Sequence, residues 1–585
     1  MTRRGTSFID LIISMAILAV LFAGIYLVYF SLVASIANIS VRTAATSVLQ
    51  AEIETIRNMP YASVGTVGGV PAGAIPQVQT VAAGNYAFVF ETTVRNIDDP
   101  FDGTLSGNPP PVDTAPADYK LVEIQATCPL CNNFGSVSLT TTVAPKNLES
   151  ATQNGSLFIY ALDANGHAVP GADVSVVNST VSPSINLADT TNINGVLQLV
   201  GVPTSTQGYQ ITVTMPGYST EMTYPPGAPS NPNPTKPNAT VVAQTVTAIT
   251  FAIDRLSALT VYTSDNRCNP VGNESFSMKG SKLIGTNPSV WKFSTTSLTN
   301  ASGTLLMQNI EWDAYALSLN DAAKDLVGTI PLNPLSVNPS STAGFRFVVQ
   351  SAADPSLLVT TVDAASGAAV PNASITVSRS GFSETLTAGH AFLTQSDWSG
   401  GQYAVQSGGI NASVSGKLTL LANASGTYAT STNDWLVSNT FDLGGSNSAF
   451  YGISWVPASQ PAGATLQFQV AANNDNASWN FIGPDGTPGS YFTTSSNPFP
   501  SSLSGNRYFR YKAYLNTTDG SVTPELDGVS VEFSADCVPP AQALFASLAQ
   551  GTYHIDVTAA NYAENSTTVS VGPGAQSSTI SLAHI

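Results

Sequence analysis

The chain has 585 residues and a formal net charge of −17 at pH 7, and only 10% of its residues are charged. Typical soluble domains carry about 25% charged residues, so Ser, Thr, Asn, Gly and Pro must cover most of this surface. The length allows about four domains of ordinary size. The acidic balance excludes a broad nucleic-acid-binding surface, because phosphate binding requires many Lys and Arg residues.

A long apolar run from Leu11 to Val41 contains no charged residue and follows a short basic start that ends in Gly5. The run exceeds the roughly 20 residues that a helix needs to cross a bilayer. Helical spacing of apolar residues continues beyond it until Pro60, which ends the pattern. We expect one helix over residues 6–59, half in the membrane and half projecting. The arginines before the span place the rest of the chain outside the cytoplasm.

One acid, Asp10, stands at the start of the apolar run. A carboxylate in a membrane is costly and is usually paired, so Asp10 is a candidate functional residue. Together with Gly5, Thr6 and the apolar helix, it resembles the N-terminus of type IV pilins and pseudopilins. That family usually has Phe or Met where Thr6 stands, and Glu where Asp10 stands. The alternative is a plain signal anchor that only tethers the protein.

The resemblance implies three roles. A prepilin peptidase would remove the leader, residues 1–5, by cutting after Gly5. Thr6 would become the mature N-terminus. The carboxylate of Asp10 would pair with the N-terminal amine of a neighbouring pilin-like subunit inside a bundle of apolar helices.

Residues 60–147 read as a small β head, with alternating segments at 86–90, 121–126 and 137–143. The arrangement resembles a pilin head, in which an antiparallel sheet packs on the projecting part of the helix. Asp98, Asp99 and Asp102 lie in a loop of this region, similar to the calcium loop of some pseudopilins, and oxygen ligands suit calcium. Short acidic turns are also common without a metal, and no cofactor is expected otherwise.

Four cysteines fall into two groups. Cys128 and Cys131 form a Cys-Pro-Leu-Cys unit without the second ligand pair that a zinc site needs. A local disulfide is expected for this pair in an oxidising compartment. Cys268 and Cys537 lie far apart in the sequence and are either free or joined between domains.

A pattern recurs from Ser156, from Leu259 and from Leu357, at a spacing of about 100 residues. Each copy has a strand, a turn with Gly or Asn, and a second alternating strand. The copies resemble carboxypeptidase-regulatory-like or collagen-adhesin B-type modules, which are small Ig-like β-sandwiches. The resemblance implies stalks and spacers without catalysis.

The third copy is interrupted, because its closing element appears only near 548–553. Residues 427–534 therefore read as an inserted jelly-roll-like sandwich, loosely similar to galactose-binding or discoidin-like domains. Four aromatic residues of the insertion are candidates for stacking on sugar rings: Trp479, Tyr491, Tyr508 and Tyr511. The alternative is that they fill the core of the sandwich.

The four histidines are scattered, and no familiar catalytic motif occurs, so we expect binding or assembly and no enzyme. The expected fold is mostly β with one long N-terminal α-helix. The expected domains are a leader (1–5), the helix (6–59), a pilin-like head (60–147), Ig-like modules at 151–254, 255–350 and 355–426 with 535–585, and the insertion (427–534).

The predicted function is a minor or tip subunit of a type IV pilus or pseudopilus with a modular adhesive head at the cell surface. Its expected partners are the membrane, other pilin-like subunits, a prepilin peptidase, and a glycan or surface-protein ligand. One alternative is a membrane-anchored stalk that does not polymerise. The other is a glycan-active enzyme, which rests on similarity of fold alone.

Overall fold

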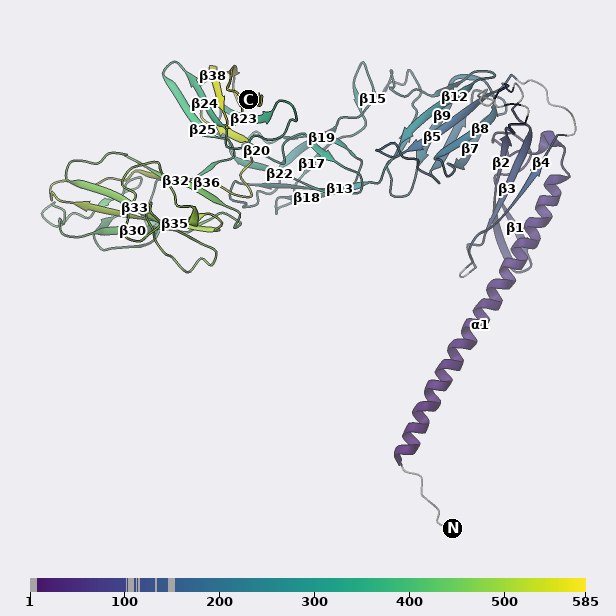
Figure 1. Cartoon of the computed structure of the whole chain (residues 1–585), viewed down its shortest axis with the longest axis horizontal. Coiled ribbons are helices and arrows are strands. Elements are labelled where there is room, and N and C mark those ends of the chain that lie inside the picture. Colours follow the sequence, from purple (N-terminus) through teal and green to yellow (C-terminus); the bar gives the residue numbers. More distant parts are fainter. Residues whose placement is uncertain are drawn as a thin grey trace, which may run out of the picture. The chain divides into compact units, whose positions relative to one another are not determined.

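The computed structural model describes residues 8–101, 103, 110–111, 113, 116–131, 134–145 and 153–585. The chain divides into two compact units, which are described separately. The first comprises Met1–Leu256 with Leu283–Trp291, and the second comprises Ser257–Lys282 with Lys292–Ile585. The prediction of a mostly β chain with one long N-terminal helix is confirmed (Figure 1).

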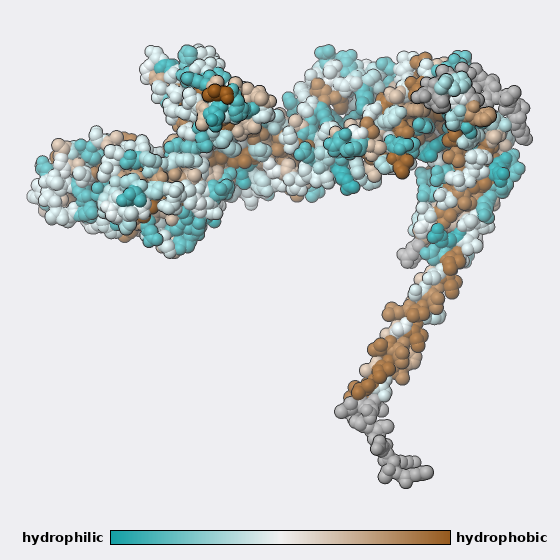
Figure 2. Space-filling model, in the orientation of Figure 1, coloured by the Kyte–Doolittle hydropathy of each residue, from teal (hydrophilic) through white to brown (hydrophobic). Residues whose placement is uncertain are grey.

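The first unit begins with α1 (Phe8–Arg57), whose two halves differ in what covers them. The large apolar side chains from Ile12 to Ile39 are exposed, and they form the bare hydrophobic surface in Figure 2. In the second half, Leu49 and Ile56 are fully buried. By length and composition the first half can cross a membrane.

A four-stranded antiparallel sheet packs on the second half of α1. Its strands, in the order in which they pair, are β1 (Val78–Ala83), β2 (Tyr86–Ile97), β3 (Tyr119–Thr127) and β4 (Val137–Val143). Alternation in β2 and β3 turns Phe88, Phe90, Val122 and Ile124 toward the helix, where they form one buried cluster. β1 is an additional strand that the sequence pattern did not predict.

The first Ig-like module completes the first unit as a sandwich of two sheets, β12-β5-β8 and β10-β9-β6-β7, with β11 pairing β9. Its strands are β5 (Gly155–Leu162), β6 (Asp173–Asn178), β7 (Ile185–Thr190), β8 (Val196–Val202), β9 (Ser205–Thr214), β10 (Glu221–Met222), β11 (Ala239–Val241) and β12 (Val246–Ala252). The guanidinium of Arg95 in β2 pairs with the buried carboxylate of Asp189 in β7. The Nδ2 of Asn96 donates to the carbonyl of Val200 at 2.8 Å. These contacts hold the module against the head.

The second unit begins with the second module, which repeats this plan with the sheets β18-β13-β22-β20 and β17-β14-β19-β21. Its strands are β13 (Ser257–Ser264), β14 (Ser275–Gly280), β17 (Ser294–Leu298), β18 (Thr304–Ile310), β19 (Asp313–Leu319), β20 (Lys324–Ile330), β21 (Leu335–Val337) and β22 (Thr342–Ser351). The short hairpin of β15 (Leu283–Gly285) and β16 (Val290–Trp291) belongs to the first unit.

The third module has the sheets β37-β23-β40 and β25-β24-β38-β39. Its strands are β23 (Ser356–Asp363), β24 (Ser374–Arg379), β25 (Phe382–Thr387), β37 (Gln542–Phe545), β38 (Gly551–Thr558), β39 (Asn565–Val571) and β40 (Ala575–Leu582). In all three modules the first strand pairs parallel with the last: β5 with β12, β13 with β22, and β23 with β40. This shared and uncommon pairing identifies the sequence repeats as three copies of one topology.

The inserted domain lies between β25 and β37, at the connection that joins β7 to β8 in the first module. It is a sandwich of the sheets β26-β36-β32-β34 and β27-β30-β35-β31, with β33 also pairing β35. Its strands are β26 (Ala391–Gln395), β27 (Tyr403–Gln406), β28 (Ile410–Asn411), β29 (Thr419–Leu420), β30 (Asp434–Ser438), β31 (Phe441–Asp442), β32 (Ala449–Val456), β33 (Ala464–Asn473), β34 (Asn497–Pro498), β35 (Tyr508–Thr517) and β36 (Gly528–Ser534).

The insertion starts earlier than the expected residue 427. β26 pairs with β36, and Leu393, Trp398 and Leu420 belong to the buried cluster of the inserted sandwich. Residues 391–426 therefore belong to the insertion and not to the third module. The pairing partner of β26 lies more than 130 residues further along the chain, so a local sequence pattern does not reveal it.

Candidate functional site

The residues of the pilin-like N-terminus lie mostly outside the described part of the chain. Gly5 and Thr6 precede the first described residue. Asp10 lies in the first turns of α1, and its side chain is outside the description. The helix that follows carries the exposed apolar surface on which the expected membrane and subunit contacts depend.

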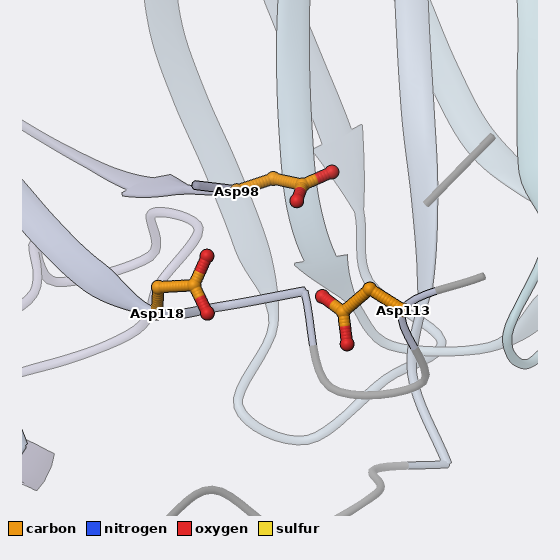
Figure 3. Close-up of side chains that lie close together, drawn as sticks. All are labelled: Asp98, Asp113 and Asp118. Atoms are coloured by element: carbon orange, nitrogen blue, oxygen red, sulfur yellow. The ribbon is translucent and has the colours of Figure 1, made fainter. Parts of the chain in front are cut away.

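An acidic cluster lies at the loop end of the β2–β3 hairpin, in the region where a calcium loop was expected (Figure 3). Its members are Asp98, Asp113 and Asp118, and one carboxylate oxygen of each lies within 4.8 Å of the others. The expected partner Asp99 instead donates its backbone N–H to Asp118, and Asp102 lies outside the described residues.

Of the three expected residues, Asp98, Asp99 and Asp102, only Asp98 belongs to the acidic cluster. The pairing of β2 with β3 places residue 98 opposite residue 118, which brings Asp118 into the cluster. Carboxylate oxygens suit a hard cation such as Ca²⁺. Ca²⁺ takes roughly six to eight oxygen ligands, so three carboxylates alone do not complete such a site. Residues 104–109, 112 and 114–115, in the same loop, are outside the description.

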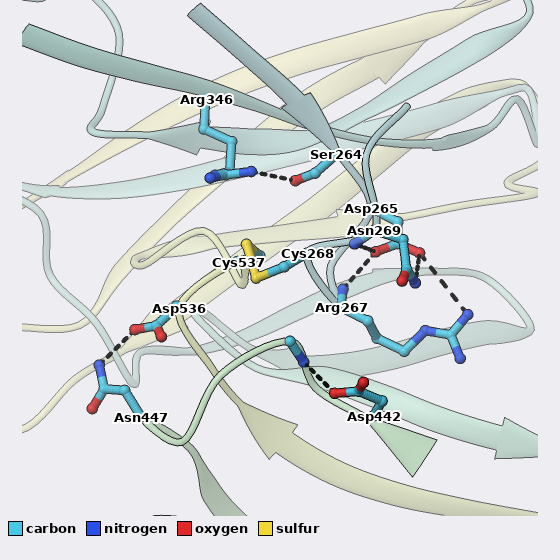
Figure 4. The surroundings of a disulfide bond; sticks show 11 residues. Ser264, Asp265, Arg267, Cys268, Asn269, Arg346, Asp442, Asn447, Asp536 and Cys537 are labelled. Carbon is cyan, nitrogen blue, oxygen red and sulfur yellow. Dashed lines mark hydrogen bonds and ion pairs between the residues drawn. A yellow bond between two sulfur atoms is a disulfide. The ribbon is translucent and has the colours of Figure 1, made fainter. Parts of the chain in front are cut away.

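The four cysteines form two disulfides. Cys128 and Cys131 close a short loop after β3, with their Cα atoms 5.3 Å apart. Cys268 and Cys537 join the second module to the end of the inserted domain (Figure 4). The turn that carries Cys268 is held by Asp265, whose carboxylate accepts from the backbone N–H groups of Arg267 and Asn269.

A cavity of about 980 Å³ lies between the end of α1, the head sheet and the first module. Lys120 lines it, and its Nζ donates to the carbonyls of Tyr61, at 2.8 Å, and Val64. The ammonium also lies 4.4 Å from the centroid of the Tyr61 ring. Lys120 faces the buried side of β3, and these contacts join β3 to the turn that follows α1.

Tyr511, one of the four predicted ligand-stacking residues, lies in the core of the inserted domain. It is 1% exposed, its hydroxyl donates to Oε1 of Gln395 at 2.6 Å, and it accepts from Nε1 of Trp398 at 2.8 Å. Burial raises the pKa of Tyr511, so the hydroxyl stays protonated as a donor. The prediction that Tyr511 contacts a ligand is therefore wrong, because strand alternation turns it inward with Phe509.

The other three predicted aromatics lie on the opposite side of β35 or next to it. Tyr508 belongs to the outward-facing set of β35, which also contains Arg510, Lys512 and Tyr514. Trp479 and Tyr491 come from the segment between β33 and β34. The indole of Trp479 lies 4.3 Å from the guanidinium carbon of Arg510, and Tyr491 meets Tyr514 edge-on.

Lys512 extends this arrangement toward β30. Its Nζ lies 4.1 Å from the ring centroid of Trp435 and 4.8 Å from that of Tyr514. We call this surface the basic-aromatic face and define it by the following residues: Trp435, Trp479, Tyr491, Tyr508, Arg510, Lys512 and Tyr514. Sequence reasoning did not single out Trp435, Arg510 or Lys512, although period-two alternation from 508 to 514 places both cations on one face.

Comparison with known proteins assigns no family. No protein-family model and no curated protein sequence matches the chain. Among solved structures, the Bacillus anthracis TIE protein is 11% identical, with a TM-score of 0.16 over 86% of this chain and 72% of that one. GBS52, the minor pilin of Streptococcus agalactiae, is 11% identical, with a TM-score of 0.18 over 34% of this chain and 98% of that one.

A third similar structure is the streptococcal ancillary pilin, at 9% identity and a TM-score of 0.15, over 74% of this chain and 99% of that one. With identities and TM-scores this low, none of the three matches assigns a family or a function. The functional evidence therefore comes from the chain's own residues.

Proposed function

We propose that the protein is a pilin-like, membrane-inserted subunit that presents a modular adhesive head outside the cell. The observation that carries this proposal is the division of α1. One continuous helix exposes every large apolar side chain from Ile12 to Ile39, and then supplies Leu49 and Ile56 to the core of the head. Exposed apolar area of this extent is unfavourable in water, so it requires a bilayer or a bundle of other apolar helices.

The continuous helix favours assembly over simple tethering. A tether needs only a span, whereas a filament subunit needs a rigid connection between the span and the head. Burial of the second half of α1 under β2 and β3 supplies that connection. The Gly5-Thr6 bond would be the processing site. Asp10 would neutralise a neighbour's N-terminal amine once the helices leave the lipid.

The three Ig-like modules and the inserted domain would form the adhesive head. This adhesive head, made of the three modules and the inserted domain, is far larger than the pilin-like sheet that packs on α1. Its size would hinder close helical packing of identical subunits. We therefore infer a minor or tip subunit. Binding without catalytic turnover is proposed for the head.

Mass analysis of the protein from its own membranes or shed filaments tests the proposal. We expect loss of residues 1–5 and a mature N-terminus at Thr6. The variant Gly5→Ala should keep the leader, and Asp10→Ala should be processed but fail to enter filaments. An uncut N-terminus in the unaltered protein would contradict the proposal and support the membrane-anchored stalk.

A further inference from the structure

The basic-aromatic face is the outer side of the sheet formed by β27, β30, β35 and β33. On the inner side, Phe509, Ala513 and Leu515 of β35 lie in the buried cluster of the inserted domain. The intervening residues of β35 point away from that core. Trp435 lies opposite Tyr514, and Val437 opposite Lys512, so β30 extends the same outer side.

The indole rings of Trp435 and Trp479 stand next to the two cations of this face and remain partly accessible, whereas Tyr514 is only 7% exposed. Trp435, Trp479, Arg510 and Lys512 are all half-buried. Next to them, Val405 of β27, which pairs with Val437, is 48% exposed. Pyranose rings have apolar C–H faces that pack on aromatic side chains, and the polar edges of the sugar then stay in water.

Among the described residues, neither cation has a carboxylate partner. No carboxylate oxygen of these residues lies within 4.0 Å of a side-chain nitrogen of Arg510 or Lys512. The Nε–H of Arg510 donates to the hydroxyl of Thr440 at 2.8 Å. This is notable in a chain where Asp and Glu number 37 against 20 Lys and Arg. The adjacent Arg507, by contrast, is paired with Asp442 at 2.7 Å.

The two carboxylates of the segment between β33 and β34, which also carries Trp479 and Tyr491, accept hydrogen bonds within that segment. Asp475 accepts from the backbone N–H groups of Ala477 and Ser478. Asp485 accepts from the backbone and hydroxyl of Thr487. Each therefore closes its own turn and leaves the positive charge of the face uncompensated.

Burial lowers the pKa of both Arg510 and Lys512, which means that each cation has lost part of its hydration. Aromatic rings compensate a cation less completely than a carboxylate does. An incoming anion would therefore gain more from these two groups than from fully hydrated surface cations. The guanidinium of Arg510 retains its two Nη groups, which can take a carboxylate in a two-pronged manner.

We propose that the basic-aromatic face binds an acidic polysaccharide whose pyranose rings carry carboxylate groups. The rings of Trp435 and Trp479 contact the sugar, and Arg510 and Lys512 pair with the carboxylates. This inference names a ligand for the proposed adhesive function, and its biological role rests on that function. The binding of the polysaccharide depends on the inserted domain alone.

The test measures binding of the detergent-solubilised full chain to polygalacturonate by biolayer interferometry at fixed ionic strength. Methyl-esterified polygalacturonate has the same backbone without the charge, and heparin carries sulfate as its main charge. We expect binding to polygalacturonate and at least tenfold weaker binding to its methyl ester. Arg510→Gln and Lys512→Gln should each weaken binding roughly tenfold or more.

Lys417→Gln is the matched control, because it removes one positive charge from the same domain at a lysine that is paired with Glu525 at 2.8 Å. It should change binding less than about twofold. Lys512→Arg retains the charge and should retain binding, which keeps the test decisive if a Gln variant fails to fold. Thermal unfolding establishes that each variant is folded.

Three results would overturn the inference. The first is no binding to polygalacturonate. The second is binding of the methyl ester or of heparin as strong as that of polygalacturonate. The third is weakening by Lys417→Gln as large as that by Arg510→Gln or Lys512→Gln. Without binding, or with equal weakening by Lys417→Gln, the cations and rings of the face would have only a structural role. Equal binding of the methyl ester or of heparin would show that the face does not select carboxylate groups. A processed protein that binds no polysaccharide refutes this inference only, whereas an unprocessed protein that binds refutes only the filament proposal.

Discussion

At the residue scale, side chains that close turns stabilise the fold together with those that fill cores. Asp397 precedes the fully buried Trp398 and holds the turn around it. Its carboxylate accepts from the backbone N–H of Ser399 at 2.9 Å and from its hydroxyl at 3.0 Å. Ser415 and Gly416 donate to the same carboxylate. These hydrogen bonds hold the pKa of Asp397 at about 2, against an ordinary value of 3.8.

This lowered pKa predicts a pH-dependent contribution to stability. A carboxylate whose pKa falls on folding stabilises the fold above its unfolded pKa, and the contribution is lost as the pH drops through the folded value. Asp397→Asn should therefore lower the melting temperature of the inserted domain at pH 7. The difference from the unaltered protein should disappear between about pH 4 and pH 2. A difference that is constant over this range would contradict the prediction.

At the element scale, α1 is one continuous helix whose two halves have different apolar patterns. Its first half has apolar residues all around, whereas its second half buries a stripe that includes Ala45, Leu49 and Ile56. A helix that is apolar on every side is typical of a membrane or a buried core, and a striped helix is typical of packing on one face. The change in pattern therefore marks where the exposed apolar part of α1 ends and the part that packs on the sheet begins.

Leu49→Ala tests the packing of this element. Leu49 is fully buried, so its truncation should cost about 2–5 kcal/mol in the free energy of unfolding of the head. Ile36→Ala, at a position that is 66% exposed, should leave the head unchanged. Hydrogen exchange of β2 and β3 in detergent measures both effects. Equal protection in the two variants would show that the helix does not support the sheet.

At the scale of the whole molecule, stability arises separately in a series of sandwiches, each with its own buried cluster. The disulfide between Cys268 and Cys537 is the covalent exception within the second unit. It closes a sequence separation of 269 residues, and long loops lose the most unfolded-state entropy when they are closed.

Replacing both Cys268 and Cys537 by Ala should destabilise the second unit by roughly 2–5 kcal/mol. Calorimetry of the oxidised protein and of the double variant measures the loss. The double variant at Cys128 and Cys131, which opens a separation of only 3 residues, is the control and should lose less. Peptide mapping without reduction checks both pairings, and free thiols at 268 and 537 would contradict this part of the fold.

The sequence by itself determined the long helix, the predominance of strands and the threefold repeat, because these depend on local periodicity. The alternation of Phe509, Tyr511 and Ala513 with Arg510 and Lys512 already indicates which side of β35 faces inward. Only the tertiary structure decided that Trp435 and Trp479, from other parts of the chain, lie next to the two cations. Three other features also depend on contacts between residues distant in sequence. They are the pairing of β26 with β36 at the start of the insertion, the disulfide between Cys268 and Cys537, and the proximity of Asp98 to Asp118. Such contacts depend on how strands pair across the fold, which no local pattern records.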